Sequence, residues 1–341
     1  MPPAIWFPTI RAGTGADIYT QRLAAGLEKR GIRTQIAWLP HRAEYAPWTV
    51  PAPQPPDWAN VVHVNSWLPH KFWPHGLPCV VTVHHLVHDP AYFPYRSALQ
   101  AAYHRLAIQA REREAIRSAD AVTTVSDYVR RTVRDFSGRT SIHVIPNWGD
   151  LEVFRPDMQH KRETGQPFRL FIAGSRSRRK GFDLLSGFTH ALGPGFEVRY
   201  AGGRSRGTSG IPHVVDLGWL SQSELVHEYQ ACDAVVSLSR YEGFGYTALE
   251  AMACGKPFIG FSTSGLSEVV DGDSAMLADI GDIDTLIQNC RRLASNPGLV
   301  ERLGSNGRAR AVTRFSVENS IEIYSGIYDR LVSDSSRNIR R

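Results

Sequence analysis

The chain of 341 residues has few cysteines and no long apolar run. Its four cysteines, at Cys79, Cys232, Cys254 and Cys290, are scattered without a Cys-x-x-Cys pair. This spacing argues against a disulfide framework or a zinc site and suits a reducing compartment. The first residues lack the charged and apolar regions of a signal peptide, and no apolar run approaches the length that spans a bilayer. These absences favour a cytoplasmic protein.

A large excess of one charge is also lacking, because the formal net charge is only +6. Residues 1–155 contain 17 Lys and Arg against 12 Asp and Glu, and the remainder contains 22 against 21. A basic first half can face phosphates or the anionic inner face of a membrane as a peripheral contact. A solvated basic surface explains the same surplus equally well. We expect no nucleic-acid partner.

Short runs rich in β-branched residues alternate with segments of helical period in both halves of the chain. The strand-like runs are residues 60–65, 78–85, 120–126, 141–146, 168–175, 196–203, 213–218, 233–239 and 256–261. The helical segments are residues 16–30, 98–118, 222–231, 246–254 and 282–295. This alternation predicts an α/β protein with two units built on parallel sheets.

The length also suits two domains of ordinary size better than one. Residues 154–168 are polar, contain proline and have no period, so they are the candidate linker. We place a first domain at residues 1–155 and a second at 165–316. A last helical segment begins near residue 317, and we expect the tail at 335–341 to be frayed.

The segment SRYEGFGYTALEAMACGKPFIGF at residues 239–261 places two carboxylates around a glycine-rich turn. Glu242 follows a strand-like run, and ligands of open α/β sheets bind outside the carboxyl ends of strands. Gly243 and Gly245 let the backbone approach a ligand closely. A helix that begins near Tyr246 directs free N–H groups and a positive dipole end toward the same place, which suits a phosphate.

The other polar groups of this segment fit the rest of a nucleotide sugar. Thr247 adds a hydroxyl donor, and Glu250 lies one turn further along the helix. A carboxylate that accepts from two vicinal hydroxyls is the usual partner of a ribose. The phosphates would then lie on the helix end, the sugar near Glu242 and the ribose near Glu250. The alternative is that both glutamates are solvated, although the apolar neighbours of Glu250 make this less favourable for that residue.

Residues 242–272, EGFGYTALEAMACGKPFIGFSTSGLSEVVDG, resemble the Glu-x7-Glu signature of the family 4 retaining glycosyltransferases. The resemblance extends more weakly over nearly the whole chain. It implies the GT-B fold, with two facing Rossmann-like domains around an interdomain cleft and residues 317–341 packed back on the first domain. It also implies that Glu242 contacts the transferred sugar, that Glu250 holds the ribose and that Phe244 belongs to the donor-binding turn.

A basic loop follows the strand-like run 168–175. Its chemically important residues are Gly174, Arg176, Arg178, Arg179 and Lys180. Cations here can neutralise a diphosphate leaving group, and arginine can do so with two hydrogen bonds. The family usually has Gly-Arg-Leu-x-x-x-Lys-Gly, which Gly174 and Lys180 match, whereas Ser175 stands in place of the arginine. Which of the three arginines replaces it stays open, and a solvated basic loop is the alternative.

The segment RAGTGADIYT at residues 11–20 resembles half of a dinucleotide fingerprint. Gly13 and Gly15 precede a helical segment, but Ile18 occupies the third glycine position, and no acidic residue closes the next strand, so NAD binding is poorly supported. The family resemblance implies a loop that lines the cleft between the domains. Asp17 would then be an acceptor-side contact, or alternatively a capping acid at the start of the helix.

The segment TVHHLVHDP at residues 82–90 contains the potential ligands His84, His85, His88 and Asp89. The family commonly has Thr-x-His-Asp here, and the resemblance implies that His84 lies near the sugar hydroxyls. A zinc or iron site is the alternative, but no matching ligand motif occurs elsewhere. Asp271-Gly-Asp273 has the composition of a turn. We therefore predict no essential metal and no cofactor other than the nucleotide sugar as co-substrate.

Together these features predict a retaining, metal-independent glycosyltransferase that moves a sugar from a nucleoside diphosphate to an acceptor hydroxyl. Stabilisation of the leaving diphosphate by Lys180, a nearby arginine and the helix end would be the main catalytic effect. The nucleobase of the donor is expected to bind near Trp219. The acceptor is expected to be a glycan or a lipid-linked glycan, in polysaccharide, lipopolysaccharide or glycolipid assembly. Residues 90–117 could lie on an anionic bilayer, or their apolar half could pack against the sheet.

Three other functions remain as alternatives. A glycoside hydrolase would use Glu242 and Glu250 as acid and base, but this leaves the basic loop unexplained. A sugar-nucleotide epimerase of the GT-B fold would use related donor contacts without an acceptor. A non-catalytic module would bind the nucleotide sugar without turnover.

Overall fold

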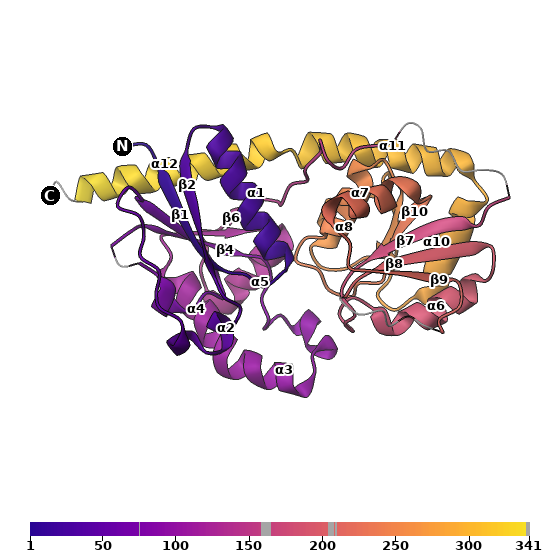
Figure 1. Ribbon diagram of the computed structural model, residues 1–341, viewed down its shortest axis with the longest axis horizontal. Helices are drawn as coiled ribbons and strands as arrows, with labels where there is room; N and C mark the ends of the chain where they lie inside the picture. The colour runs from indigo at the N-terminus through magenta and orange to yellow at the C-terminus, as the bar shows by residue number, and fades with distance from the viewer. Residues whose placement is uncertain (75, 158–164, 204–207, 209, 339–341) are drawn as a thin grey trace. The chain divides into compact units, whose positions relative to one another are not determined.

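The structure, a computed structural model, describes the chain except for residues 75, 158–164, 204–207, 209 and 339–341 (Figure 1). It contains two compact units. Unit 1 comprises residues 1–93, 97–147 and 317–341, and unit 2 comprises residues 94–96 and 148–316. Part of the candidate linker, residues 158–164, and the end of the tail, residues 339–341, lie outside the described residues. Each unit contains one parallel six-stranded sheet, which confirms the predicted α/β class.

The sheet of unit 1 has the strand order β2-β1-β3-β4-β5-β6. Its strands are β1 (Ala4–Ile10), β2 (Arg33–Leu39), β3 (Val61–Asn65), β4 (Cys79–Val83), β5 (Ala121–Thr124) and β6 (His143–Val144). Its main helices are α1 (Gly15–Lys29), α2 (Arg42–Tyr45), α3 (Ala98–Tyr103), α4 (Gln109–Ser118), α5 (Asp127–Ser137) and α12 (Val317–Asn338). The central strands are almost wholly buried, as expected for a parallel sheet with both faces covered.

A buried polar network joins α12 to the sheet of unit 1. The His63 Nδ1 atom lies 2.6 Å from the Tyr328 hydroxyl, and its Nε2 atom lies 2.7 Å from the Thr82 hydroxyl. The Tyr19 hydroxyl bonds those of both Thr82 and Tyr324. Burial, with a smaller effect of His84, lowers the pKa of His63 to about 3, so its ring is neutral at physiological pH. Because each of these groups is buried, their hydrogen bonds offset the cost of removing them from water.

The sheet of unit 2 has the strand order β12-β11-β10-β7-β8-β9. Its strands are β7 (Phe168–Ala173), β8 (Phe196–Ala201), β9 (Val214–Gly218), β10 (Ala234–Ser237), β11 (Phe258–Phe261) and β12 (Ala275–Ala278). Its helices include α6 (Leu185–Leu192), α7 (Gln222–Ala231), α8 (Tyr246–Ala253), α9 (Leu266–Val269), α10 (Ile283–Ala294) and α11 (Pro297–Arg314). After β7, the chain adds β8 and β9 on one side of that strand. It then adds β10, β11 and β12 on the other side, so the strand order reverses between β7 and β10.

The cysteines and the hydropathy of the helices can be compared with what the composition predicts. All four cysteines are buried and unpaired. None of the helices in the described part of the chain combines the length and hydropathy that crossing a bilayer requires.

We expect Tyr328→Phe to lower the free energy of unfolding by about 1–2 kcal/mol, because the buried His63 ring loses a hydrogen-bond partner. Denaturant unfolding of both proteins measures the difference. Ser333→Ala is the control, since it removes only an exposed hydroxyl bond to the Asp329 carbonyl within α12. Equal unfolding midpoints for Tyr328→Phe and the parent protein would show that the network adds no stability.

Candidate active site

The candidate site lies at the carboxyl ends of β7 and β10 in unit 2, where the strand order reverses. These strands pair directly, with Ala234 opposite Leu170 and Val235 opposite Phe171. The loops that leave them are joined by a hydrogen bond of 2.9 Å from the Arg240 amide to the Arg179 carbonyl. Reversal points of this kind are where open α/β sheets bind ligands.

A cluster of three charged side chains forms the centre of this site. The Lys180 ammonium donates to the Glu242 carboxylate, and an Arg179 guanidinium nitrogen lies 3.6 Å from its other oxygen. The side chains of Lys180 and Glu242 are only 18% and 12% exposed. Glu242 is therefore not a solvated loop residue, and two cations face one anion in a region with little water.

The protonation states follow from the same contacts. Burial by itself would raise the pKa of Glu242, but the charges of Lys180 and Arg179 outweigh it and hold that pKa below its usual value. Burial lowers the pKa of the Lys180 ammonium, and the charges of Glu242 and Glu250 oppose this without cancelling it. Glu250 thus has a weaker electrostatic effect on the same ammonium group as Glu242.

Two glycines with positive φ bring the chain segments of the site together. At Gly181 (φ 72°), an added Cβ would lie 2.1 Å from the Leu238 carbonyl oxygen. At Gly245 (φ 115°), an added Cβ would lie 2.6 Å from a side-chain carbon of Leu266. A side chain at Gly181 would force the loops after β7 and β10 apart, and one at Gly245 would push the loop after β10 away from α9. Both glycines therefore allow close packing between segments of the protein, and not only the close approach of a ligand to the backbone.

Helix α8 begins directly after Gly245 and presents Thr247 and Glu250. Within the described residues, no side chain caps its amino terminus. Thr247 is half-buried in the first turn. Glu250 is only 8% exposed, and its Oε2 atom accepts a hydrogen bond of 2.9 Å from the Tyr229 hydroxyl. A solvated surface position for Glu250 is therefore excluded.

The arginines of the basic loop have different partners. Arg176 donates to an Asp216 carboxylate oxygen at 2.8 Å, and its guanidinium lies 5.8 Å from the centre of the Phe182 ring. Arg178 is exposed. Only Arg179 forms an ion pair with Glu242 among the described contacts of these three residues. The structure therefore brings Lys180 and Arg179 together and directs Arg176 toward β9.

Three other residues expected at the donor site have distinct surroundings. The Gly174 carbonyl accepts from the Tyr200 hydroxyl at 2.8 Å, and this glycine packs beside the Lys180 side chain. The Phe244 ring is buried 5.7 Å from both Tyr246 and Phe315, so its side chain belongs to the core. Trp219 is 73% exposed in the loop after β9.

In unit 1, the loop with Gly13 and Gly15 follows β1. The Asp17 carboxylate accepts from the Ala12 amide at 3.0 Å and from the Gly13 amide at 2.7 Å. Asp17 is an acid of the first turn of α1, and these bonds show that it holds the preceding loop. This agrees with the capping alternative for its side chain.

His84 follows β4 in the same unit. Its Nε2 atom lies 3.0 Å from the Asn65 side-chain oxygen, and its ring meets the edge of Tyr19 at 4.7 Å. Burial lowers the pKa of His84 to about 4, so the ring is neutral near pH 7. A neutral imidazole in this position can donate or accept a hydrogen bond.

The histidines after β4 do not form a metal centre in the described structure. No group of three or more His, Cys, Asp or Glu side chains is placed to hold a metal ion in the part of the chain that is described. Asp89 accepts from the Tyr128 hydroxyl at 2.7 Å, and His88 stacks on Phe136. Asp271 bonds the Ser274 hydroxyl at 2.8 Å within a turn, as its sequence predicts.

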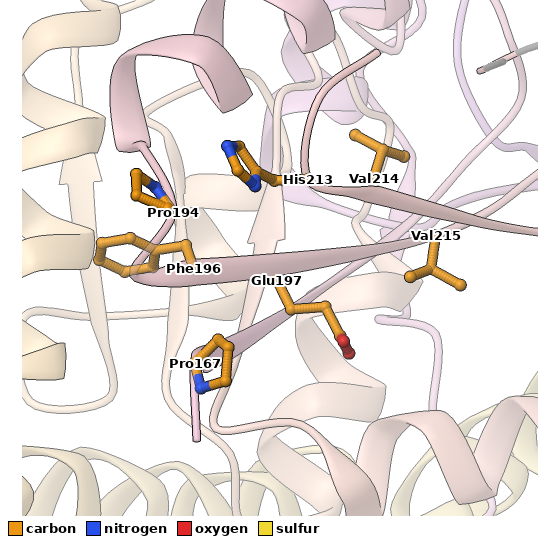
Figure 2. A pocket seen from close by; sticks show the side chains of 7 residues that line it. All are labelled: Pro167, Pro194, Phe196, Glu197, His213, Val214 and Val215. Atoms are coloured by element: carbon orange, nitrogen blue, oxygen red, sulfur yellow. The ribbon is translucent and has the colours of Figure 1, made fainter. Parts of the chain in front are cut away.

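A separate pocket lies at the amino ends of β8 and β9 (Figure 2). It is lined by Pro167, Pro194, Phe196, Glu197, His213, Val214 and Val215. Its carboxylate, Glu197, is already paired with Arg169 at 3.1 Å. This pocket is at the opposite end of the strands from Glu242 and Lys180, so it is not part of the candidate site.

Comparison with known proteins supports a glycosyltransferase. Residues 157–310 match the family described as glycosyl transferases group 1, and residues 56–153 match glycosyltransferase family 4. The MMP alpha-(1->4)-mannosyltransferase of Mycolicibacterium hassiacum is 36% identical over 129 residues, which cover 37% of this chain and 31% of that protein. The D-inositol 3-phosphate glycosyltransferase of Acidothermus cellulolyticus is 27% identical over 311 residues, which cover 80% of this chain and 67% of that protein.

Two solved structures have a similar fold. Sucrose-phosphate synthase from Thermosynechococcus elongatus superposes with a TM-score of 0.81 at 19% identity, covering 97% of this chain and all of that one. HepE from Anabaena, solved in complex with UDP and glucose, superposes with a TM-score of 0.72 at 18% identity, covering 96% and 99%. With two parallel α/β units and matches to both family models, the chain belongs to the family 4 glycosyltransferases of the GT-B fold.

Proposed function

We propose that this glycosyltransferase uses a nucleoside diphosphate sugar as donor and retains the configuration of the transferred sugar. The observation on which the proposal rests is the half-buried group of Lys180 and Arg179 around Glu242 at the reversal of strand order. Among the described ion pairs, these two cations share the single carboxylate of Glu242. A diphosphate supplies further negative charge to them, and HepE, solved with UDP and glucose, supports this class of donor.

Binding of the donor exchanges the partners of these cations. The diphosphate accepts hydrogen bonds from Lys180 and Arg179, and the amino terminus of α8 adds its positive dipole end. Glu242, released from Lys180, then accepts from hydroxyls of the transferred sugar. Glu250 accepts from the ribose hydroxyls. No metal is required, because these groups provide the positive charge.

The chemical step is a displacement on one face of the sugar. The bond from the anomeric carbon to the phosphate oxygen breaks, and both electrons stay on the departing diphosphate. The acceptor hydroxyl forms the new bond from the same face, and its proton passes to the departing phosphate. Charge that develops on the diphosphate meets cations that are already in place, which is the usual source of the largest rate effect. Neutral His84 is proposed to contact sugar hydroxyls.

A glycan or lipid-linked glycan is the proposed acceptor, and α3 provides a surface for it. Among the described residues of α3, none is buried, so core packing explains the apolar side chains of α4 but not those of α3. Leu99 of α3 and Leu106 of the adjoining π-helical turn, His104–Ile108, are each 81% exposed. They lie two helical turns apart, and the exposed Arg105 adjoins them. We name Leu99, Leu106 and Arg105 the α3 surface, and we propose that it contacts an anionic bilayer. Figure 1 shows α3 at the edge of unit 1.

Variants of Glu250 and Glu242 should have different effects, one on nucleotide affinity and the other on the turnover number. We expect Glu250→Ala to weaken nucleoside diphosphate binding about tenfold or more, since a ribose partner is lost. Glu242→Gln should not weaken that affinity, because it removes the charge that the diphosphate displaces, and it should lower the turnover number about 100-fold, because Glu242 acts on the transferred sugar. Calorimetry with UDP, GDP and ADP and transfer assays with their sugars measure both effects.

The exposed Glu301 of α11 offers a matched control, and Glu301→Ala should behave as the parent protein. Wild-type affinity and turnover in both Glu242→Gln and Glu250→Ala would refute the assignment.

The three arginines of the basic loop form a matched series. Arg179→Ala should lower the turnover number about 100-fold, as expected for loss of one preorganised group. Arg176→Ala should instead lower stability, because Asp216 loses this ion-pair partner and keeps hydrogen bonds from backbone amides. Arg178→Ala should change neither. Transfer rates and denaturant midpoints test this, and a larger rate loss for Arg178→Ala than for Arg179→Ala would contradict it.

Leu99→Asp with Leu106→Asp should reduce sedimentation with vesicles of phosphatidylcholine and phosphatidylglycerol at least about fivefold, since apolar area is lost and negative charge is added. Val312→Asp, at an exposed apolar position of α11, should bind like the parent protein. Equal sedimentation of all three proteins would exclude the α3 surface, and so would concentration-dependent dimerisation that only the double variant abolishes.

A further inference from the structure

Tyr229 of α7 is fixed by its surroundings. Its ring is fully buried and meets Phe171 edge to face, with 5.0 Å between the ring centres and an angle of 82°. Phe154 makes a second such contact at 5.8 Å. Aromatic packing from two directions leaves the ring little freedom, so the position of its hydroxyl is set by the core of unit 2.

That hydroxyl donates to Glu250 Oε2 at 2.9 Å. Burial and then the charge of Glu250 raise the pKa of Tyr229 well above its usual value, so the hydroxyl keeps its proton. A nearly buried carboxylate is costly unless hydrogen bonds satisfy it. The bond also restricts the terminal torsion of a flexible glutamate side chain. Tyr229 therefore sets the direction in which Glu250 presents its carboxylate.

We infer that Tyr229 is a positioning residue which orients Glu250 toward the ribose and thereby makes the site selective for ribonucleotide donors. The inference rests on the proposed function, in which Glu250 accepts from the ribose hydroxyls. Recognition of two vicinal hydroxyls requires a carboxylate held in a defined orientation by supporting contacts. A site built for such hydroxyls rejects an analogue that lacks them, because a buried polar group is then left unpaired.

The test compares a nucleoside diphosphate with its 2′,3′-dideoxy analogue. Whichever of UDP, GDP and ADP stabilises the parent protein most in thermal unfolding is used as the probe, and calorimetry measures both affinities. We expect the parent protein to prefer the ribonucleotide by about tenfold or more. Tyr229→Phe, which keeps the ring packing, should weaken ribonucleotide binding about fivefold and leave dideoxynucleotide binding within about twofold.

Two further variants separate positioning from stability. If Tyr229 acts through Glu250, adding Tyr229→Phe to Glu250→Ala should cause no further loss of discrimination. Tyr328→Phe also removes a buried tyrosine hydroxyl bond, but in unit 1, so it should leave the ratio of the two affinities unchanged.

An unchanged affinity ratio in Tyr229→Phe, or a further loss in the Glu250→Ala background, would overturn the positioning role. A parent protein that binds the nucleotide without any preference for ribose would instead overturn the assignment of Glu250 in the proposed function. The two failures are thus distinguishable.

Discussion

The ion pair between Lys180 and Glu242 determines what this site can do. Removing two charged groups from water is costly, and their mutual attraction seldom repays more than that cost. Arg179 adds a second cation beside the same carboxylate, so both cations share Glu242 as an ion-pair partner. A diphosphate that replaces Glu242 as the partner of both cations would bring more negative charge to them, and it would leave a carboxylate free for sugar hydroxyls.

The rest of unit 2 keeps these groups at their positions. Gly181 permits contact between the loops after β7 and β10, and Arg240 strengthens that contact through two hydrogen bonds to Asp183, at 2.7 and 2.9 Å. On the β9 side, Asp216 holds Arg176. Beside α8, Tyr229 holds Glu250. We therefore propose that Lys180 and Arg179 provide the positive charge for the diphosphate, while other polar residues orient the site.

Much of this arrangement follows from the sequence, but not its side-chain partners. The strand runs and the Glu242 and Lys180 motifs were predictable, because hydrophobic period and loop position suffice for both. Strand β1 was not predicted: Pro8 lies in it, beyond the residues paired with β3, and proline argues against a central strand. Whether Arg179 or Arg176 lies beside Glu242 depends on the conformation of the loop after β7, which the sequence pattern does not specify. Tyr229 belongs to no motif and becomes significant only when α7 packs beside α8.

A crystal structure of the protein with a bound nucleoside diphosphate sugar would test most directly whether Lys180 and Arg179 bind the diphosphate. We expect phosphate oxygens within hydrogen-bonding distance of Lys180 Nζ and the Arg179 guanidinium, with the bond from Lys180 to Glu242 broken. A structure in which that bond is intact and the nucleotide is bound elsewhere would contradict the proposed roles of Lys180 and Arg179.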